Sequence, residues 1–102
     1  MVTISQELVI NKDDLKSAGL VFRAANHKLR QQILVSLNGK SGMTVTHLYK
    51  ELNLEQSVAS QHLAILRKAE LVCARREGKN VLYSVNTDKI TLLHTIAGKL
   101  LK

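Results

Sequence analysis

The strongest constraint on the fold of this chain is a pair of helical patterns separated by Leu54 and Glu55 alone. In the first pattern, apolar residues recur on one helical face at Val45, Leu48 and Leu52. Thr44 is a suitable N-cap for this helix, and Asn53 tolerates the left-handed backbone conformation that ends one. Two helices joined so tightly must cross at a large angle, which is the helix-turn-helix arrangement.

The second helix of this pair, expected over residues 56–69, has two opposite faces. One face is apolar and is predicted to lie in the core: Val58, Ala59, Leu63, Ile65, Leu66 and Ala69. The other face is small, polar and cationic: Ser57, Ser60, Gln61, Ala64, Arg67 and Lys68. No acidic residue occurs between Ser57 and Lys68, whereas ordinary solvated helices carry charges of both signs. Such a face is suited to close approach to a polyanion.

A β-hairpin is predicted directly after this helix, over residues 72–85. The apolar residues change there from helical spacing to alternation, and Gly78 provides the turn. Basic and amide side chains lie at or near the tip: Arg75, Arg76, Lys79 and Asn80. A basic hairpin that follows the second helix of a helix-turn-helix is predicted to be a wing.

Three further helices are expected outside this unit. One follows Asn26, which is a suitable N-cap, and ends at the glycine-containing run 38–42. Its inner face consists of Leu29, Ile33, Leu34 and Leu37. The other two helices begin at Lys12 and near Thr87, and residues 1–11 are predicted to form a loose arm or an extra turn.

The first and last helices carry more apolar surface than a monomer normally exposes. The first has a stripe at Leu15, Ala18, Phe22 and Ala25, with Leu20 and Val21 beside it. The last has a stripe at Ile90, Leu93, Ala97 and Leu100, with Leu92, Ile96 and Leu101 beside it. The fold class expected is therefore mainly α with a small β-hairpin, a single winged helix-turn-helix domain over residues 1–102 that has four helices, the hairpin and a fifth helix.

The composition favours packed helices and a basic surface. The 102 residues include no proline and only three aromatic residues, so the core must be built from Leu, Ile, Val and Ala. A domain of this size buries a modest fraction of its apolar surface, so help from a second subunit is expected. The formal charge is +7, with no net charge over residues 1–26 and +3 over residues 56–83. A basic surface that includes the 56–69 helix is therefore predicted.

Several classes of protein are excluded by what the sequence lacks. Cys73 is the single cysteine, which excludes an intramolecular disulfide or multi-thiolate metal site. It is expected to be a small buried hydrophobe, with a redox-sensing thiol as the alternative. The N-terminus does not resemble a signal peptide, and no segment approaches the roughly 20 apolar residues of a membrane span, so a soluble cytoplasmic protein is expected. No nucleophile and base set or glycine-rich phosphate loop has supporting context, so neither catalysis nor a cofactor is expected.

Three stretches resemble the ArsR/SmtB-type family of bacterial winged-helix repressors. They are residues 27–34, residues 56–72 (QSVASQHLAILRKAELV) and residues 76–85 (REGKNVLYSV). The resemblance covers roughly residues 20–90. It implies a homodimer built through the first and last helices, which binds an inverted-repeat DNA operator and leaves it when an inducer binds.

The sequence departs from this family at the familiar metal sites. Where members that sense soft metals have a Cys-Val-Cys motif, this chain has Thr44-Val45-Thr46, and hydroxyls do not replace thiolates for a soft ion. The last helix offers Asp88 and His94 without the remaining ligands of the family's zinc site. Both metal sites are therefore expected to be absent. Glu55 and Glu70 replace a usual Ser and a usual Gly, and neither is predicted to prevent folding.

The DNA-contacting residues are predicted on the outer face of the 56–69 helix and on the hairpin. Gln61 is assigned to direct base contact, because its amide can donate and accept at once, as the edge of adenine requires. Ser57 and Ser60 are assigned to bases or phosphates, Gln56 to a phosphate at the helix N-terminus, and Ala64 to a thymine methyl group. The remaining predicted contacts, to phosphates or to the minor groove, are Arg67, Lys68, Arg75, Arg76, Lys79 and Asn80.

Several alternatives stay open at the level of sequence. His62 is either a hydrogen-bonded structural histidine or a phosphate contact. The wing and helix charges are either DNA contacts or solvated surface charges. The function expected is that of a DNA-binding repressor that responds to an unknown signal. One alternative is a winged helix used for protein interaction, and another is a metal- or redox-responsive repressor with an atypical site.

Overall fold

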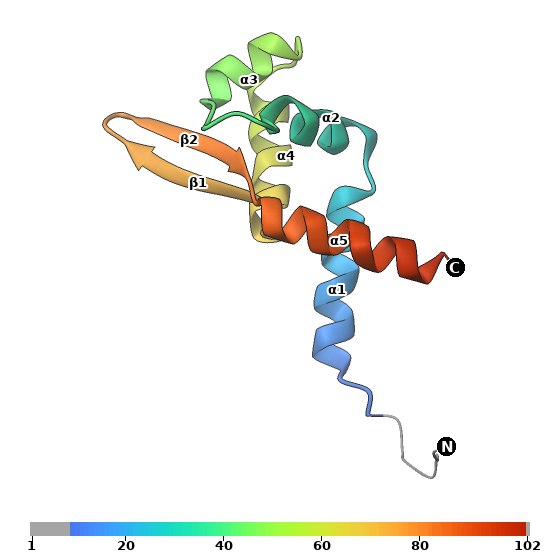
Figure 1. Cartoon of the computed structure of the whole chain (residues 1–102). Coiled ribbons are helices and arrows are strands. Elements are labelled where there is room, and N and C mark those ends of the chain that lie inside the picture. The colour runs from blue at the N-terminus through green and yellow to red at the C-terminus, as the bar shows by residue number, and fades with distance from the viewer. Residues whose placement is uncertain (1–8, 102) are drawn as a thin grey trace.

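The computed structural model describes residues 9–101, which form five helices and one two-stranded antiparallel hairpin (Figure 1). The elements are α1 (Lys12–Ala25), α2 (Lys28–Leu37), α3 (Val45–Glu51), α4 (Gln56–Lys68), β1 (Val72–Glu77), β2 (Asn80–Val85) and α5 (Thr87–Leu100). Both the predicted fold class and the predicted order of elements are confirmed. Most of the predicted arm over residues 1–11 lies outside the described range.

The core lies beneath the helix-turn-helix and the start of the hairpin. Its fully buried large side chains are Ile33, Leu37, Met43, Leu48, Leu63, Leu66 and Leu71. Helix α4 contributes Ala59, Leu63 and Leu66, which follow one another along a single narrow stripe. The prediction that Ile65 lies in the core is wrong, because Ile65 is 42% exposed. It lies about 120° round the helix from Ala59, outside the stripe that meets α2 and α3.

The turn between α3 and α4 has the predicted chemistry. The side chain of Thr44 caps α3 by accepting a hydrogen bond of 3.1 Å from the backbone N–H of His47. Asn53 adopts the left-handed conformation with φ 56°. Glu55 has extended backbone at the N-cap of α4 and makes no side-chain capping bond. The turn therefore depends on Asn53 and on backbone bonds rather than on a cap at Glu55.

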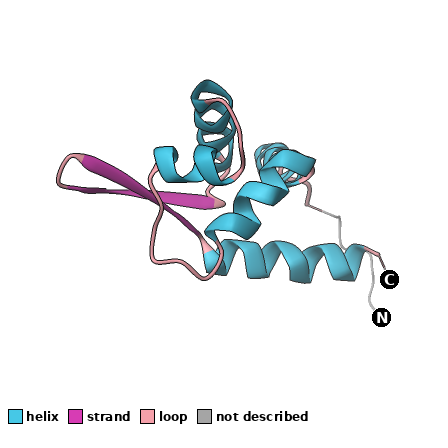
Figure 2. Cartoon of the chain, turned by 90° about the horizontal axis from the view of Figure 1, so that it is seen from above, coloured by secondary structure: helices cyan, strands magenta, loops and turns pink. Residues whose placement is uncertain are grey.

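The hairpin has a regular register and a two-residue turn at Gly78 and Lys79. Pairing runs from Val72 opposite Val85 to Glu77 opposite Asn80, and Gly78 has φ +63°. The hairpin extends away from the helices (Figure 2). The prediction that Cys73 is buried is wrong, because its side chain is exposed. Successive strand residues point to opposite faces, so the burial of Val72 turns Cys73 outward.

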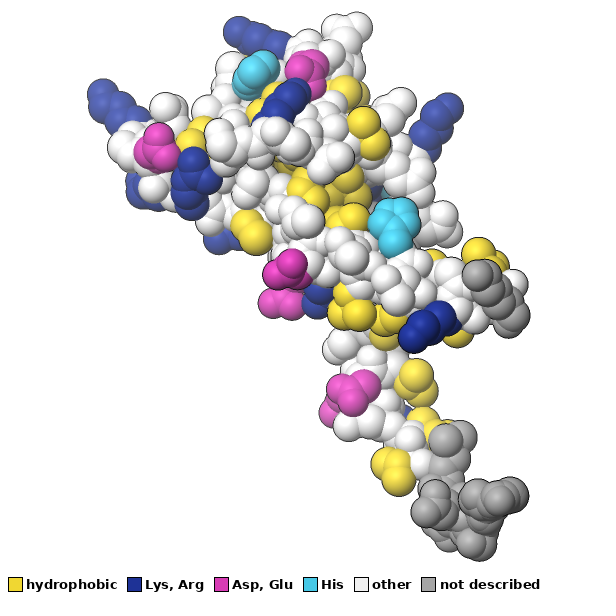
Figure 3. All heavy atoms as spheres, in the orientation of Figure 1, with side chains coloured by type: hydrophobic (Ala, Val, Ile, Leu, Met, Phe, Trp, Pro, Cys, Tyr) yellow, Lys and Arg dark blue, Asp and Glu magenta, His cyan; other side chains and the backbone are white. Residues whose placement is uncertain are grey.

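Helices α1 and α5 bury few of their side chains within the described chain. Ala24 is the single buried residue of α1, and α5 has none. Leu15 is 63% exposed on α1, and Leu92 and Leu100 are 54% and 72% exposed on α5. Hydrophobic side chains emerge along both helices in the space-filling view (Figure 3). The apolar surface expected from the sequence is therefore present and uncovered.

The junction between α1 and α2 differs from the prediction in one residue. The prediction that Asn26 is the N-cap of α2 is wrong, because His27 occupies that position and accepts a hydrogen bond of 3.2 Å at Nδ1 from the N–H of Leu29. Asn26 instead ends α1, where its N–H donates to the carbonyl of Phe22. An N-cap needs extended backbone, and only His27 has it.

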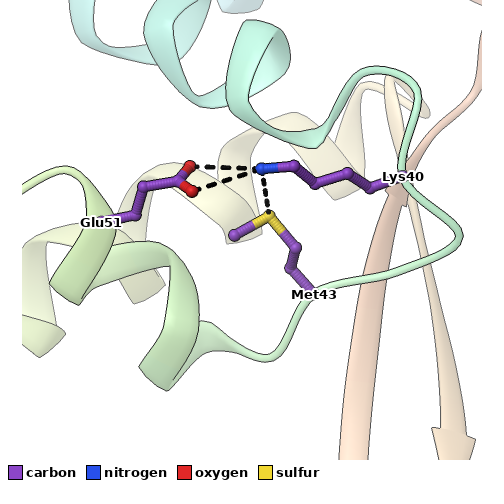
Figure 4. Close-up of polar contacts among 3 residues, drawn as sticks. All are labelled: Lys40, Met43 and Glu51. Atoms are coloured by element: carbon purple, nitrogen blue, oxygen red, sulfur yellow. Dashed lines mark hydrogen bonds and ion pairs between the residues drawn. The ribbon is translucent and has the colours of Figure 1, made fainter.

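A small polar cluster holds the connection between α2 and α3. Nζ of Lys40 lies 3.3 and 3.4 Å from the two carboxylate oxygens of Glu51 and 3.6 Å from Sδ of Met43 (Figure 4). The hydrogen bond from Lys40 lowers the pKa of the Glu51 carboxyl below its usual range. Met43 also pairs with Tyr83 of β2 through two backbone hydrogen bonds of 2.8 and 2.9 Å. The connection is thus attached both to α3 and to the hairpin.

Glu70 is held in a conformation that disfavours any side chain with a Cβ. Its φ is +62°, and in that region a non-glycine residue is destabilised by about 1–2 kcal/mol. Its exposed carboxylate pairs with Nζ of Lys89 at 3.2 Å, a contact worth between about 0 and 1 kcal/mol. We expect Glu70→Gly to raise the free energy of unfolding by about 1 kcal/mol in urea titrations.

The matched control is Glu70→Gln, which keeps the Cβ and removes the charge. We expect this variant to be no more stable than the parent protein. A stability of Glu70→Gly that is unchanged or lower would show that the ion pair outweighs the backbone strain.

Candidate nucleic-acid interface

Helix α4 presents all of the side chains that the sequence assigned to DNA on its solvent side. These exposed residues are Gln56, Ser57, Ser60, Gln61, Ala64, Arg67 and Lys68. The first turn of α4 carries no acidic residue, and its last turn carries Arg67 and Lys68. The free N–H groups of the first turn, beside Gln56 and Ser57, suit a phosphate. The face is therefore open, small and cationic.

A groove separates α4 from the hairpin and joins the two predicted contact surfaces. It has a volume of about 410 Å³ and is lined by Ser60, Leu63, Ala64, Arg67, Lys68 and Tyr83. Tyr83 is not among the predicted contacts, and on β2 it shares a face with Val81 and Val85. Its phenol can donate and accept hydrogen bonds. The groove thus combines two cations with two hydroxyl groups.

The two arginines of the wing lie on opposite faces of the hairpin. The register pairs Ala74 with Tyr83 and Arg76 with Val81, so Arg76 shares the face of Tyr83, which lines the groove. Arg75 lies on the other face. It donates a hydrogen bond of 2.9 Å from Nη1 to the carbonyl of Ser41.

Arg75 is also paired within the hairpin, at 3.3 Å from Nη2 to the Glu77 carboxylate. Within residues 9–101, by contrast, Arg76 and Lys79 form no ion pair. Lys79 and Asn80 are exposed at the tip. Of the four predicted wing contacts, Arg75 is therefore the one whose guanidinium already has partners within the chain.

His62 of α4 contacts α2 through Arg30 and His27. Its Nδ1 lies 3.2 Å from Nη1 of Arg30, and its ring centroid lies 4.8 Å from that of His27. Its side chain is half-buried. Burial lowers the pKa of the His62 imidazole below its usual value, and the electrostatic interactions with His27 and Arg30 lower it further. These contacts favour the structural role for His62 over the phosphate contact.

Two further observations concern metals and membranes. Among residues 9–101, no three His, Cys, Asp or Glu side chains are grouped so that they could hold a metal ion. In the same part of the chain, no helix is both long enough and apolar enough to cross a membrane.

A helix-turn-helix with an open polar and cationic second helix, followed by a basic hairpin, defines a winged-helix DNA-binding transcriptional regulator. The chain belongs to the arsR family of bacterial regulatory proteins. Residues 27–73 match the sequence profile of the family described as "Bacterial regulatory protein, arsR family". The resemblance found in the sequence is thereby confirmed, and the protein is a regulator rather than an enzyme.

Individual relatives agree with this assignment. The transcriptional activator HlyU of Vibrio cholerae is 33% identical over 85% of this chain and 82% of its own length. The transcriptional repressor SdpR of Bacillus subtilis is 36% identical over 66% of this chain and 73% of its own length. The crystal structure of NolR from Sinorhizobium fredii is similar with a TM-score of 0.72 and 31% identity, over 93% of this chain and 95% of that chain.

Proposed function

We propose that this chain is a homodimeric repressor that binds an inverted-repeat operator through α4 and the hairpin. The single domain would dimerise through α1 and α5 and would act in the cytoplasm, where bacterial operators are found. The observation that carries the proposal is that two surfaces of different chemistry are both left open: a cationic face on α4 and the hairpin, and an apolar face on α1 and α5.

The apolar face supports dimerisation. Besides the exposed leucines, a cleft of about 210 Å³ between α1 and α5 is lined mainly by Ala18, Val21, Phe22, Leu92, Leu93 and Ile96. An exposed apolar surface of this kind is typical of a protein interface, and a small domain benefits from the additional burial. A two-fold axis would then relate two copies of α4.

The proposed DNA contacts are those predicted from the sequence. Gln61 reads a base, Ser57, Ser60 and Ala64 approach the groove, and Gln56, Arg67 and Lys68 contact the backbone. On the hairpin the contacts are Arg75, Arg76, Lys79 and Asn80. All of these side chains are exposed, which supports this assignment. Two recognition helices about 34–36 Å apart would require a palindromic operator with half-sites one helical turn apart.

The direction of regulation and the signal are part of the proposal. Repression is proposed because a dimer seated on a promoter blocks it, and SdpR, at 36% identity, is named a repressor. The releasing signal would not be a metal held by thiolates on α3, because Thr44 and Thr46 supply hydroxyl groups only.

The experiment combines sedimentation with titration of promoter DNA taken from beside the chain's own gene. We expect a dimer that protects an imperfect palindrome, and we expect Leu92→Glu to give monomers with at least about tenfold weaker operator binding, since a buried unpaired carboxylate opposes association. Thr91→Glu, on another side of α5, is the matched control and should remain dimeric. Salt-independent binding, or a monomeric parent protein with full operator affinity, would contradict the proposal.

A further inference from the structure

Arg30 joins three helices at a single point. Its Nε donates to the carbonyl of Ala24 at 2.6 Å, and its Nη2 donates to the carbonyl of Arg23 at 3.1 Å. These carbonyls belong to the last turn of α1, where backbone acceptors have no partner within the helix. The remaining terminal nitrogen, Nη1, lies 3.2 Å from Nδ1 of His62 on α4. The guanidinium of α2 therefore links the end of α1 to the recognition helix.

The contact with His62 determines the state of the imidazole. A guanidinium can only donate hydrogen bonds, and it stays protonated in proteins. The hydrogen bond consequently requires Nδ1 of His62 to be an acceptor, which a protonated imidazole does not offer. The neutral ring must carry its single proton on Nε2.

We propose that Arg30 and His62 form a positioning pair that orients α4 for DNA binding, and that tight binding requires His62 to be neutral. His62 follows Gln61 directly in the chain. A change in the contact between His62 and α2 therefore changes the orientation of the proposed reading face. The pair goes beyond the proposed dimer and operator, but it rests on α4 being the DNA-reading helix.

The groups around His62 all oppose its protonation. Helix α2 presents His27 and Arg30, whereas α1 presents backbone carbonyls to Arg30 and not to His62. Within one turn of α4 the neighbours Val58, Ala59, Ile65 and Leu66 carry no charge. Among residues 9–101, neither His27, Arg30 nor His62 has a carboxylate partner. Protonation would place two donors and two positive charges 3.2 Å apart.

The sign of the pH effect separates this role from a phosphate contact. Because the pKa of His62 is lowered in the folded chain, the positioned state is intact above the ordinary histidine pKa of about 6.5 and is lost as the pH falls from there through the lowered pKa. DNA affinity should therefore fall on acidification. If His62 contacted a phosphate, protonation would instead strengthen binding and steepen its dependence on salt.

The test measures operator affinity by fluorescence anisotropy between pH 7.5 and 5.5 at constant ionic strength. The variant His62→Asn keeps an oxygen acceptor near the position of Nδ1 and does not titrate. We expect the parent protein to lose about tenfold more affinity than His62→Asn over this range, which is about 1.4 kcal/mol of binding free energy. The ratio of the two profiles removes the pH effects that both proteins share.

Two further measurements keep the outcome decisive. Long-range proton and nitrogen NMR spectra of the parent protein should show Nδ1 of His62 unprotonated at pH 7.5, whatever the variants do. Arg30→Lys keeps the positive charge but lacks the planar set of guanidinium donors. It should weaken operator binding at pH 7.5 and abolish the additional loss of affinity at low pH. The proposal would be overturned if the operator affinities of the parent protein and His62→Asn changed with pH in parallel. It would also be overturned if the affinity of the parent protein rose as the pH fell.

Gln61→Ala is measured in the same assay as a separate control. If Gln61→Ala leaves operator affinity unchanged, the assignment of the reading face fails. The comparison of the parent protein with His62→Asn tests the role of Arg30 and His62 whatever the result for Gln61→Ala.

Discussion

Replacing both Gln61 and Ser60 by alanine is expected to reduce the affinity of the protein for its operator by about 100-fold or more. Both side chains are exposed on the open face of α4. A bidentate amide contact to a base is worth about 1–3 kcal/mol of discrimination, and a hydroxyl contact adds to it. The loss should appear as reduced specificity, with the affinity for unrelated DNA almost unchanged. Anisotropy titrations against operator and scrambled duplexes measure both quantities.

Arg67→Ala is the matched comparison on the same helix. Because Arg67 is assigned to the phosphate backbone, its loss should weaken binding to every sequence and reduce the slope of log affinity against log salt by about 0.9. Gln32→Ala, exposed on α2, should change neither quantity. If Gln61 and Ser60 can be removed without any change in specificity, base reading is performed elsewhere.

Truncating Leu66 to alanine is expected to lower the free energy of unfolding by about 2–5 kcal/mol. Leu66 is fully buried at the point where α4 packs on the core, so its removal leaves a cavity. Ile65, the neighbouring residue, is 42% exposed. Ile65→Ala should therefore cost less than about 1 kcal/mol. Urea unfolding of the two variants under identical conditions measures the difference.

The pair of variants tests the placement of the buried stripe of α4. Equal losses for Leu66→Ala and Ile65→Ala would show that Ile65 is covered in the native protein, as its hydrophobicity alone suggested. A small loss for Leu66→Ala would contradict the packing of α4 on the core.

The helical and strand patterns were predictable because they depend on neighbours within a turn or two. The stripe at Ala59, Leu63 and Leu66, the cap at Thr44 and the left-handed turn at Asn53 are all local features, and each occurs as predicted. The cationic face of α4 was predictable for the same reason, since side chains three and four residues apart share a helix face.

The exposed fraction of individual side chains was less predictable. Ile65 and Cys73 are apolar or small, yet both are exposed. Hydrophobicity gives only a preference for burial. Which residues are buried is decided by the width of the contact between α4 and its neighbours and by the face that β1 turns inward. Asn26 and His27 show the same limit at a cap, where the backbone at one residue selects the capping side chain.

The sequence by itself determined the order of the elements, the helix-turn-helix, the basic hairpin and the residues on the open cationic face of α4. Only the tertiary structure decided which side chains are already engaged. Arg30 meets His62 across 32 positions, and Arg75 meets Ser41 across 34. Such partners depend on how the helices cross and on the path of the connection from α2 to α3. Periodicity within one helix or strand contains no information about either. The tertiary structure therefore places His62, for which the sequence left two roles open, at the contact between α2 and α4.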